Sequence, residues 1–236
     1  MKLAIMQPYF FPYIGYFSLI KNTDQFILFD SVQFINHGWI ERNRILKPGE
    51  GWQYISVPLI KHSRETKIKD IQINNSSDWR DRIFRQLEHY KKRAPFYDRT
   101  MEVVKEALNI QTNSIVQLNK HVLNTVCEYI GIKADIHIFS EMNLLIDKVN
   151  APDEWALNIC KKLGGVDEYW NPEGGLDFFH RYKYEREAIE IKFLKMRLTK
   201  YPQRRKEFIE GLSIIDMMMF LEPDNILERL DDYDII

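Results

Sequence analysis

The chain has 236 residues, enough for one large domain, and its 45% apolar residues can build a sizeable core. Its formal net charge of −1 provides no overall field for nucleic acid or an anionic membrane surface. No stretch approaches the roughly 20 apolar residues of a transmembrane helix, and the opening MKLAIMQP is too short for a signal peptide, so we expect a cytoplasmic protein that binds no membrane.

The first 30 residues predict a strand, a helix and a second strand. Residues 2–7 and 25–30 are short apolar runs typical of buried strands, and residues 13–24 have apolar side chains at helical spacing. Such a unit makes the two strands parallel neighbours. The stretch QPYFFPYIGYF then lies at the carboxyl end of a parallel strand, where open α/β sheets bind ligands.

The loop between the first strand and the helix is the first candidate site. Pro8 and Pro12 stiffen it, and a glycine at the helix start permits close approach of a ligand. A packed hydrophobic corner is the alternative interpretation. The candidate ligand contacts are Gln7, Tyr9, Tyr13 and Gly15.

The segment 31–47 is predicted to be an irregular loop rich in polar and aromatic side chains. Its two arginines could clamp a diphosphate, and its tryptophan could stack on a base or sugar. Alternatively, the arginines pair with Glu41 and Glu50 on the surface. The candidate binding residues are Gln33, Trp39, Arg42, Asn43 and Arg44.

Two histidines are positioned as general-base candidates, because an imidazole titrates near neutral pH. His37 lies in the polar loop, and His62 follows in a basic turn that a solvated surface would also explain. Asp30, at the end of the second strand, could orient His37.

The middle of the chain is predicted to be helical, after strands at 54–59 and 68–73. We expect one α/β domain over residues 1–236, with a mostly parallel, Rossmann-like sheet and residues 77–131 as a helical insertion. A separate helical subdomain is the alternative.

The remaining pattern continues the α/β alternation, with strands and helices predicted in the segments 135–140, 151–165, 166–175, 188–195, 212–221 and 223–233. Asn171, Gly174 and Gly175 follow one of these strands, and a Gly-Gly loop there could cradle a phosphate.

Several signatures are missing. The sequence has no dinucleotide-binding, P-loop, serine-hydrolase or zinc-protease motif. Cys127 and Cys160 lack zinc-ligand spacing, so no metal site is predicted and no cofactor can be named.

Five segments in order resemble the WbqC-like family of bacterial proteins: QPYFFPYIGYFSLI, FILFDSVQFINHGWIERNRI, VPLIKHSRETKIKDIQI, GGVDEYWNPEGG and LSIIDMMMF. Because such proteins are often encoded among surface-polysaccharide genes, the resemblance implies a role in making or decorating O-antigen (lipopolysaccharide) sugars. The first unit is also distantly similar to pantoate–β-alanine ligases and other nucleotidylyltransferase-like folds, but YIGY replaces their H-x-G-H motif and lacks both histidines.

The leading hypothesis is a transferase that moves an acyl or aminoacyl group to the amine of a nucleotide-linked amino sugar. The alternatives are nucleotidyl transfer or ATP-dependent ligation, and a non-catalytic nucleotide-sugar binder or scaffold. The expected partner is a small molecule, with nucleic acid entering only if a tRNA is the aminoacyl donor, and homo-oligomerisation stays open.

Overall fold

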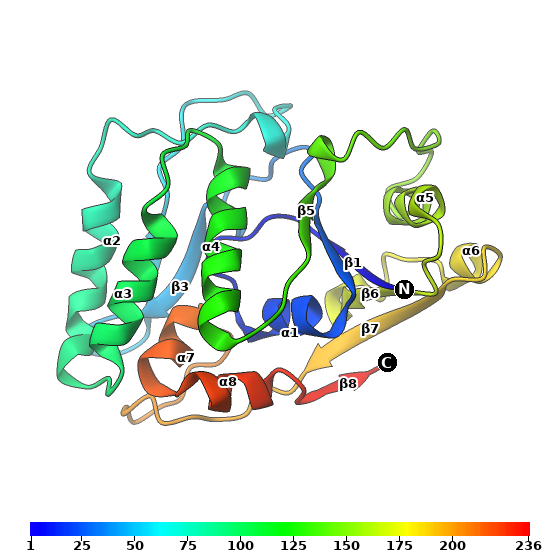
Figure 1. The fold of residues 1–236 in the computed structure, drawn as a ribbon. Coiled ribbons are helices and arrows are strands. Elements are labelled where there is room, and N and C mark those ends of the chain that lie inside the picture. Colours follow the sequence, from blue (N-terminus) through cyan, green and yellow to red (C-terminus); the bar gives the residue numbers. More distant parts are fainter.

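A six-stranded sheet forms the centre of the computed structural model, which describes residues 1–236 (Figure 1). The strand order is β5-β2-β1-β6-β7-β8, and only β8 is antiparallel to its neighbour. The strands are β1 (Lys2–Met6), β2 (Gln25–Leu28), β5 (Ile136–Ile138), β6 (Glu168–Pro172), β7 (Glu190–Met196) and β8 (Tyr233–Ile235). The predicted α/β class with a mostly parallel sheet is confirmed.

The opening unit folds as the sequence predicts. β1 and β2 are parallel neighbours, with Leu3 opposite Gln25, and α1 (Ile14–Asn22) connects them. The carboxyl ends of both strands therefore reach the same edge of the sheet. The loop between Met6 and Ile14 starts at that edge.

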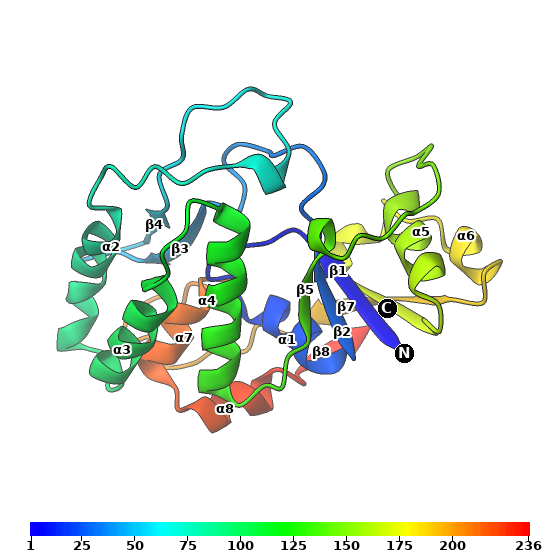
Figure 2. The ribbon, with the colours of Figure 1, turned by 45° about the horizontal axis from the view of Figure 1, so that its top comes forward.

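Alternating side chains of the strands feed two hydrophobic clusters, one on each face of the sheet. Ala4 and Phe26 belong to the larger cluster, which includes α1 and α4 (Ile115–Ile130), whereas Leu3 and Ile5 belong to a smaller one under α5 (Glu154–Leu163). Figure 2 shows α5 and α6 (Arg181–Glu185) together on the side of the sheet away from α4.

Most other elements extend the larger cluster beyond the sheet. An antiparallel hairpin, β3 with β4, lies beside helices drawn from both the middle and the end of the chain, and α3 packs on α4 and α7. These elements are β3 (Arg42–Leu46), β4 (Trp52–Ser56), α2 (Trp79–Leu87), α3 (Tyr97–Leu108), α7 (Ile214–Phe220) and α8 (Pro223–Arg229). Short 3-10 turns complete the chain: η1 (Ile68–Asp70), η2 (Glu88–Lys92), η3 (Phe139–Glu141) and η4 (Glu173–Gly175).

Three local predictions are wrong, and one predicted strand has different bounds. The segment 31–47 is not irregular throughout, because β3 forms at its end, and the strand predicted at 54–59 is β4, two residues earlier. The strand predicted at 68–73 is η1 followed by isolated bridges. Its apolar alternation arises because Ile68, Ile71 and Ile73 are buried, although the segment pairs with its neighbours only through single bridges. The last helix ends at Arg229, and the chain then adds β8 as an edge strand.

A buried carboxylate on α7 joins three distant segments. Asp216 is fully buried, and it accepts hydrogen bonds from the hydroxyls of Tyr90 (2.5 Å) and Tyr201 (2.6 Å) and from Nε2 of Gln203 (2.9 Å). Tyr90 in turn accepts from the amide of Leu46 in β3. The network fixes the segment that precedes α7 against the hairpin.

Burial raises the pKa of Asp216 from its ordinary value of 3.8 to about 6, and the hydrogen bonds from Tyr201, Tyr90 and Gln203 oppose the rise. The folded chain therefore holds this proton at pH values where the unfolded chain has lost it. The resulting stabilisation is fully present below pH 3.8 and is lost as the pH rises through about 6. A shift of this size corresponds to about 3 kcal/mol.

From pH 4 to pH 7, we expect the unfolding free energy of the wild type to fall by up to about 3 kcal/mol relative to that of Asp216→Asn. Asparagine does not titrate in this range, so only the wild type carries this pH dependence. Urea unfolding of both proteins across the range measures it. Parallel pH profiles would show that Asp216 titrates normally in the fold.

Candidate functional site

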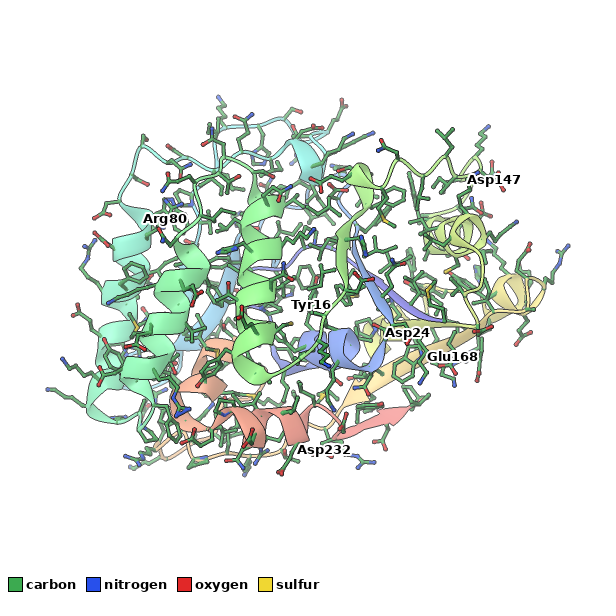
Figure 3. All side chains as sticks on the ribbon, in the orientation of Figure 1. Tyr16, Asp24, Arg80, Asp147, Glu168 and Asp232 are labelled. Atoms are coloured by element: carbon green, nitrogen blue, oxygen red, sulfur yellow. The ribbon has the colours of Figure 1, made fainter.

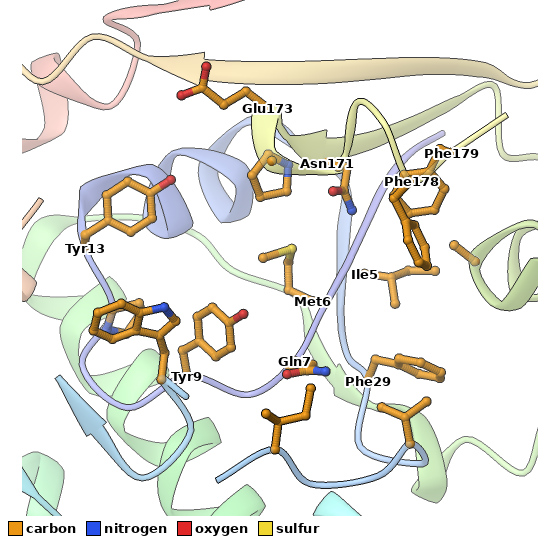
Figure 4. A pocket seen from close by; sticks show the side chains of 18 of the residues that line it. Ile5, Met6, Gln7, Tyr9, Tyr13, Phe29, Asn171, Glu173, Phe178 and Phe179 are labelled. Atoms are coloured by element: carbon orange, nitrogen blue, oxygen red, sulfur yellow. The ribbon is translucent and has the colours of Figure 1, made fainter. Parts of the chain in front are cut away.

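A cavity of about 1080 Å³ opens at the carboxyl edge of the parallel strands (Figure 4). Its floor comes from the end of β1 and the residue after it, Met6 and Gln7, with Phe29 following β2 and Asn171 in β6. This is the edge at which open α/β sheets bind ligands. The position that the sequence predicts for the site therefore coincides with this cavity.

The loop 7–13 divides its side chains between the core and the cavity. Phe10 and Phe11 are fully buried, whereas Tyr9 and Tyr13 line the cavity. The two phenylalanines therefore form a packed corner, as one interpretation of QPYFFPYIGYF predicts, while the two tyrosines form part of the cavity wall. The buried Tyr16 (Figure 3) donates from its hydroxyl to the carbonyl of Gln7 over 2.8 Å and fixes the start of the loop.

Two buried asparagine side chains supply the backbone contacts that hold this loop. Nδ2 of Asn43 donates to the carbonyls of Phe10 (3.1 Å) and Phe11 (3.0 Å), while its Oδ1 accepts from the amide of Arg44 (2.8 Å). Nδ2 of Asn119, from α4, donates to the carbonyl of Pro8 over 2.8 Å. Asn43 lines the cavity, but its amide nitrogen and oxygen already make hydrogen bonds to backbone groups of Phe10, Phe11 and Arg44.

The wall tyrosines are neutral hydrogen-bonding groups. Burial raises the pKa of Tyr9 and Tyr13 above the ordinary value of 10, and for Tyr13 the charge of Glu173 adds to the rise. Gly15 does not line the cavity. A Cβ atom there would lie 2.5 Å from the Tyr13 hydroxyl oxygen, so the glycine lets the Tyr13 ring lie against the first turn of α1.

Arg44 is the only basic residue in the cavity wall, and no carboxylate lies within 4.0 Å of it. Its Nη2 donates to the carbonyl of Gly211 over 3.1 Å, and its Nε is buried without an acceptor. Its Cζ lies 5.5 Å from the ring centre of Trp39 and 5.3 Å from that of Trp52. The guanidinium is held by aromatic rings and one carbonyl, and its charge is not neutralised.

Arg42, two residues earlier in β3, does not take part in the predicted clamp. Its guanidinium donates to the carbonyls of His37 and Gly38 and packs 4.1 Å from the ring centre of Tyr54. It is not among the residues that line the cavity. The alternative pairing with Glu41 or Glu50 does not form either, so the prediction of a two-arginine clamp is wrong for Arg42.

The predicted catalytic residues lie outside the cavity wall. Asp30 is buried, and its two oxygens accept from the amide (3.0 Å) and hydroxyl (2.6 Å) of Ser140, so it caps η3 and does not orient His37. His37 is exposed. His62 is half-buried, with Nδ1 2.9 Å from the carbonyl of Ile60. Nε2 of His62 lies 3.3 Å from Oδ1 of Asn36, so the polar contacts of this histidine are made to the loop and not to the cavity.

The end of β6 and the turn after it form another wall. Nδ2 of Asn171 donates to the Tyr169 hydroxyl over 2.8 Å, and a Cβ on Gly175 would collide with Oδ1 of Asn171. Gly174 and Gly175 both line the cavity, but Glu173 beside them is the only acidic residue of the wall. A carboxylate here opposes the predicted phosphate cradle. Glu173 contacts Lys195 at 3.4 Å, and both side chains are about half exposed.

Other wall residues were missed by the sequence prediction. The wall includes Trp155 from α5 and two adjacent aromatic residues from the loop after η4, Phe178 and Phe179. Gln33, which was predicted, also lines the cavity, and its Nε2 donates to the carbonyl of Arg64 over 2.7 Å. The adjacent phenylalanines in GLDFFHRY, within a polar stretch, were the signal that could have indicated them.

The polar side-chain groups in the wall are amides, tyrosine hydroxyls, two indole N–H groups, one guanidinium and one carboxylate. The wall contains neither histidine nor cysteine. Across the chain, no group of three or more His, Cys, Asp or Glu side chains is arranged to hold a metal ion. None of the helices combines the length and apolarity needed to cross a membrane.

Comparison with known proteins gives one family and one relative. The model of the WbqC-like protein family matches residues 7–228. An uncharacterized protein of Mycobacterium tuberculosis, Rv1507c, is 28% identical over 220 residues, which is 92% of each chain. No solved structure matches the chain significantly.

Proposed function

We propose that this chain, which belongs to the WbqC-like protein family, binds a nucleotide-linked amino sugar in the cavity and transfers an acyl group to its amine. The observation that carries the proposal is the unneutralised guanidinium of Arg44 in the wall of a cavity otherwise built from aromatic rings and amides. The frequent occurrence of such proteins among surface-polysaccharide genes is consistent with this substrate class.

The diphosphate is assigned to Arg44. Its Nη2 donates to one carbonyl and its Nη1 makes no hydrogen bond within the protein, and a planar guanidinium can donate two parallel hydrogen bonds to phosphate oxygens. Trp39, whose ring lies against this guanidinium, is exposed enough to stack on a base. A nucleotide sugar combines these two recognition elements in one ligand.

The sugar is assigned to the tyrosine side of the cavity. Tyr9 and Tyr13 provide ring faces and hydroxyls, and Gln7 adds an amide at the end of β1. Figure 4 shows the Tyr13 and Tyr9 rings on one side of the cavity, with Glu173 above. Such a mixture of aromatic faces and neutral hydrogen-bonding groups suits the apolar faces and hydroxyls of a sugar ring.

Glu173 is assigned as the group that receives the amine proton. In the proposed step the sugar nitrogen attacks the carbonyl carbon of an acyl thioester, the C–N bond forms and the C–S bond breaks. The proton of the amine passes to the Glu173 carboxylate, and the thiolate leaves. The cavity wall offers no other carboxylate and no imidazole for this task.

We expect Glu173→Gln to lower kcat by about 100-fold or more and to leave nucleotide-sugar affinity nearly unchanged, because general-base catalysis contributes about 10² to 10⁴. Turnover of UDP-glucosamine and other nucleotide-linked amino sugars with a panel of acyl thioesters, followed by mass spectrometry of the product, measures kcat. Calorimetry gives the affinity.

His37→Gln is the matched control, since His37 is exposed and outside the cavity wall. Loss of turnover in this variant, with full turnover in Glu173→Gln, would show that His37 and not Glu173 is the general base.

The second candidate function is a non-catalytic nucleotide-sugar binder, which the absence of histidine and cysteine from the wall favours. Binding without turnover by any thioester would establish it, and ATP-dependent release of pyrophosphate would indicate nucleotidyl transfer.

A further inference from the structure

We infer that the end of the cavity opposite the tyrosines binds an apolar acyl chain, so that the transferred group is a hydrophobic acyl group and not a charged aminoacyl group. The inference rests on the proposed function for the identity of the reaction. The surface that would bind the acyl chain is formed by residues that have no part in holding the diphosphate or the amine.

Four aromatic and aliphatic side chains from three parts of the fold meet at this end. Ile5 comes from β1, Phe29 follows β2, and Phe178 and Phe179 come from the loop after η4. Figure 4 shows these four side chains gathered on the side of the cavity away from Tyr9 and Tyr13. The residues that carry charge in the cavity wall, Arg44 and Glu173, are not among them.

Aromatic contacts support this surface from behind. The Phe29 ring lies 5.2 Å from Trp155 and 5.4 Å from Phe139, measured between ring centres. The Phe178 and Phe179 rings lie 4.8 Å apart in an edge-to-face arrangement. Ring pairs of this kind are favourable contacts, so they stabilise the apolar end of the cavity.

Ile35 and Phe178 are the most exposed large apolar side chains in the cavity wall. Phe178 is 48% exposed and Ile35, in the loop after β2, is 64% exposed. Large apolar side chains that line a cavity and remain in water are typical of ligand-binding sites. A chain lying against Phe178 would remove that surface from water, which favours binding at about 25 cal/mol per Å².

An aminoacyl group fits this end poorly. Its protonated amine would require a carboxylate or several acceptors after leaving water. The one carboxylate of the wall, Glu173, influences Tyr13, on the other side of the cavity. An uncharged hydrocarbon chain requires neither, because apolar side chains alone stabilise it.

The test is a homologous series of straight-chain S-acyl-pantetheines with two, four, six and eight acyl carbons, titrated into the protein by calorimetry without a sugar acceptor. We expect the affinity to rise by about fourfold for each added methylene, the factor that corresponds to burial of one CH₂ group. An affinity that does not change with chain length would overturn the inference.

Phe178→Asp places a charge on this surface, at a position exposed enough to leave folding intact. We expect this variant to lose most of the dependence on chain length. Leu176→Asp is the matched control, since Leu176 is exposed in the same loop but does not line the cavity, and it should retain the wild-type dependence. Equal dependence in the two variants would contradict the assignment.

UDP-glucosamine titrated into the same proteins separates this inference from the proposed function. If the sugar nucleotide does not bind while the affinity for S-acyl-pantetheines still rises with acyl length, the proposed function fails and the acyl-chain site stands. If the sugar nucleotide binds and chain length has no effect, the inference fails and the proposed function stands.

Discussion

Replacing Arg44 by Gln is expected to weaken nucleotide-sugar binding by about 10- to 100-fold, the range that corresponds to charged hydrogen bonds of about 1.5–3 kcal/mol. The guanidinium has no carboxylate partner, so its removal leaves no buried charge unpaired. The loss should therefore appear in binding of the diphosphate, and the affinity for the free nucleoside should stay nearly constant. Calorimetry with the nucleotide sugar and with the nucleoside measures both values.

Arg42→Gln is the matched control for this prediction. It makes the same chemical change two residues away in β3, at a side chain that donates to loop carbonyls and does not line the cavity. We expect its affinity for the nucleotide sugar to stay within about threefold of the wild type, in line with a change below 1 kcal/mol. Equal losses in both variants would support the two-arginine clamp suggested by the sequence.

Asn43→Leu is expected to lower the free energy of unfolding by about 2 kcal/mol or more. The substitution conserves shape approximately, but it leaves the carbonyl of Phe10 and the amide of Arg44 without their hydrogen-bond partners, while the carbonyl of Phe11 keeps only the hydroxyl of Ser213. Each unsatisfied buried group costs about 1–3 kcal/mol. Asn43 is 3% exposed, so water cannot replace the lost contacts without opening the loop.

Urea unfolding of the variant at pH 7 measures this loss, with the exposed Asn109→Leu at the end of α3 as the control. The control should change stability by less than about 0.5 kcal/mol, as surface substitutions usually do. A loss below about 1 kcal/mol in Asn43→Leu would show that the loop is held by packing and not by these hydrogen bonds.

The sequence predicted the opening strand, helix and strand because local patterns determine them. Apolar runs at 2–7 and 25–30 flank a helix with apolar spacing, and the short connections leave only a parallel, adjacent arrangement. This unit determines where the carboxyl ends of the parallel strands lie, and the cavity opens at these ends. For this reason the position of the candidate site followed from about 30 residues.

The detailed membership of the site depended on contacts that have no local signature. Arg42 and Arg44 have the same side chain and a spacing of two, which places them on one side of a strand. Only the path of the loop before β3 decides that Arg42 turns back to the carbonyls of His37 and Gly38, while Arg44 reaches the cavity. A loop path of this kind cannot be read from residue types.

The other missed residues come from distant segments. Glu173 and Phe178 reach the cavity because β6 lies beside β1, although about 165 residues separate them in the chain. Asp30 was predicted to act on His37 because the two are close in sequence, but η3 brings Ser140 nearer to it. Long-range pairing of strands and turns, which one sequence does not specify, determines these neighbours.

The most direct test of the nucleotide-sugar proposal is a crystal structure of the protein with UDP-glucosamine. We expect the diphosphate within about 3 Å of the Arg44 guanidinium nitrogens and the sugar between Tyr9, Tyr13 and Glu173, with the apolar end near Phe178 left free for the acyl chain. Density for the ligand elsewhere on the surface, or a diphosphate in the cavity that Arg44 does not contact, would contradict it.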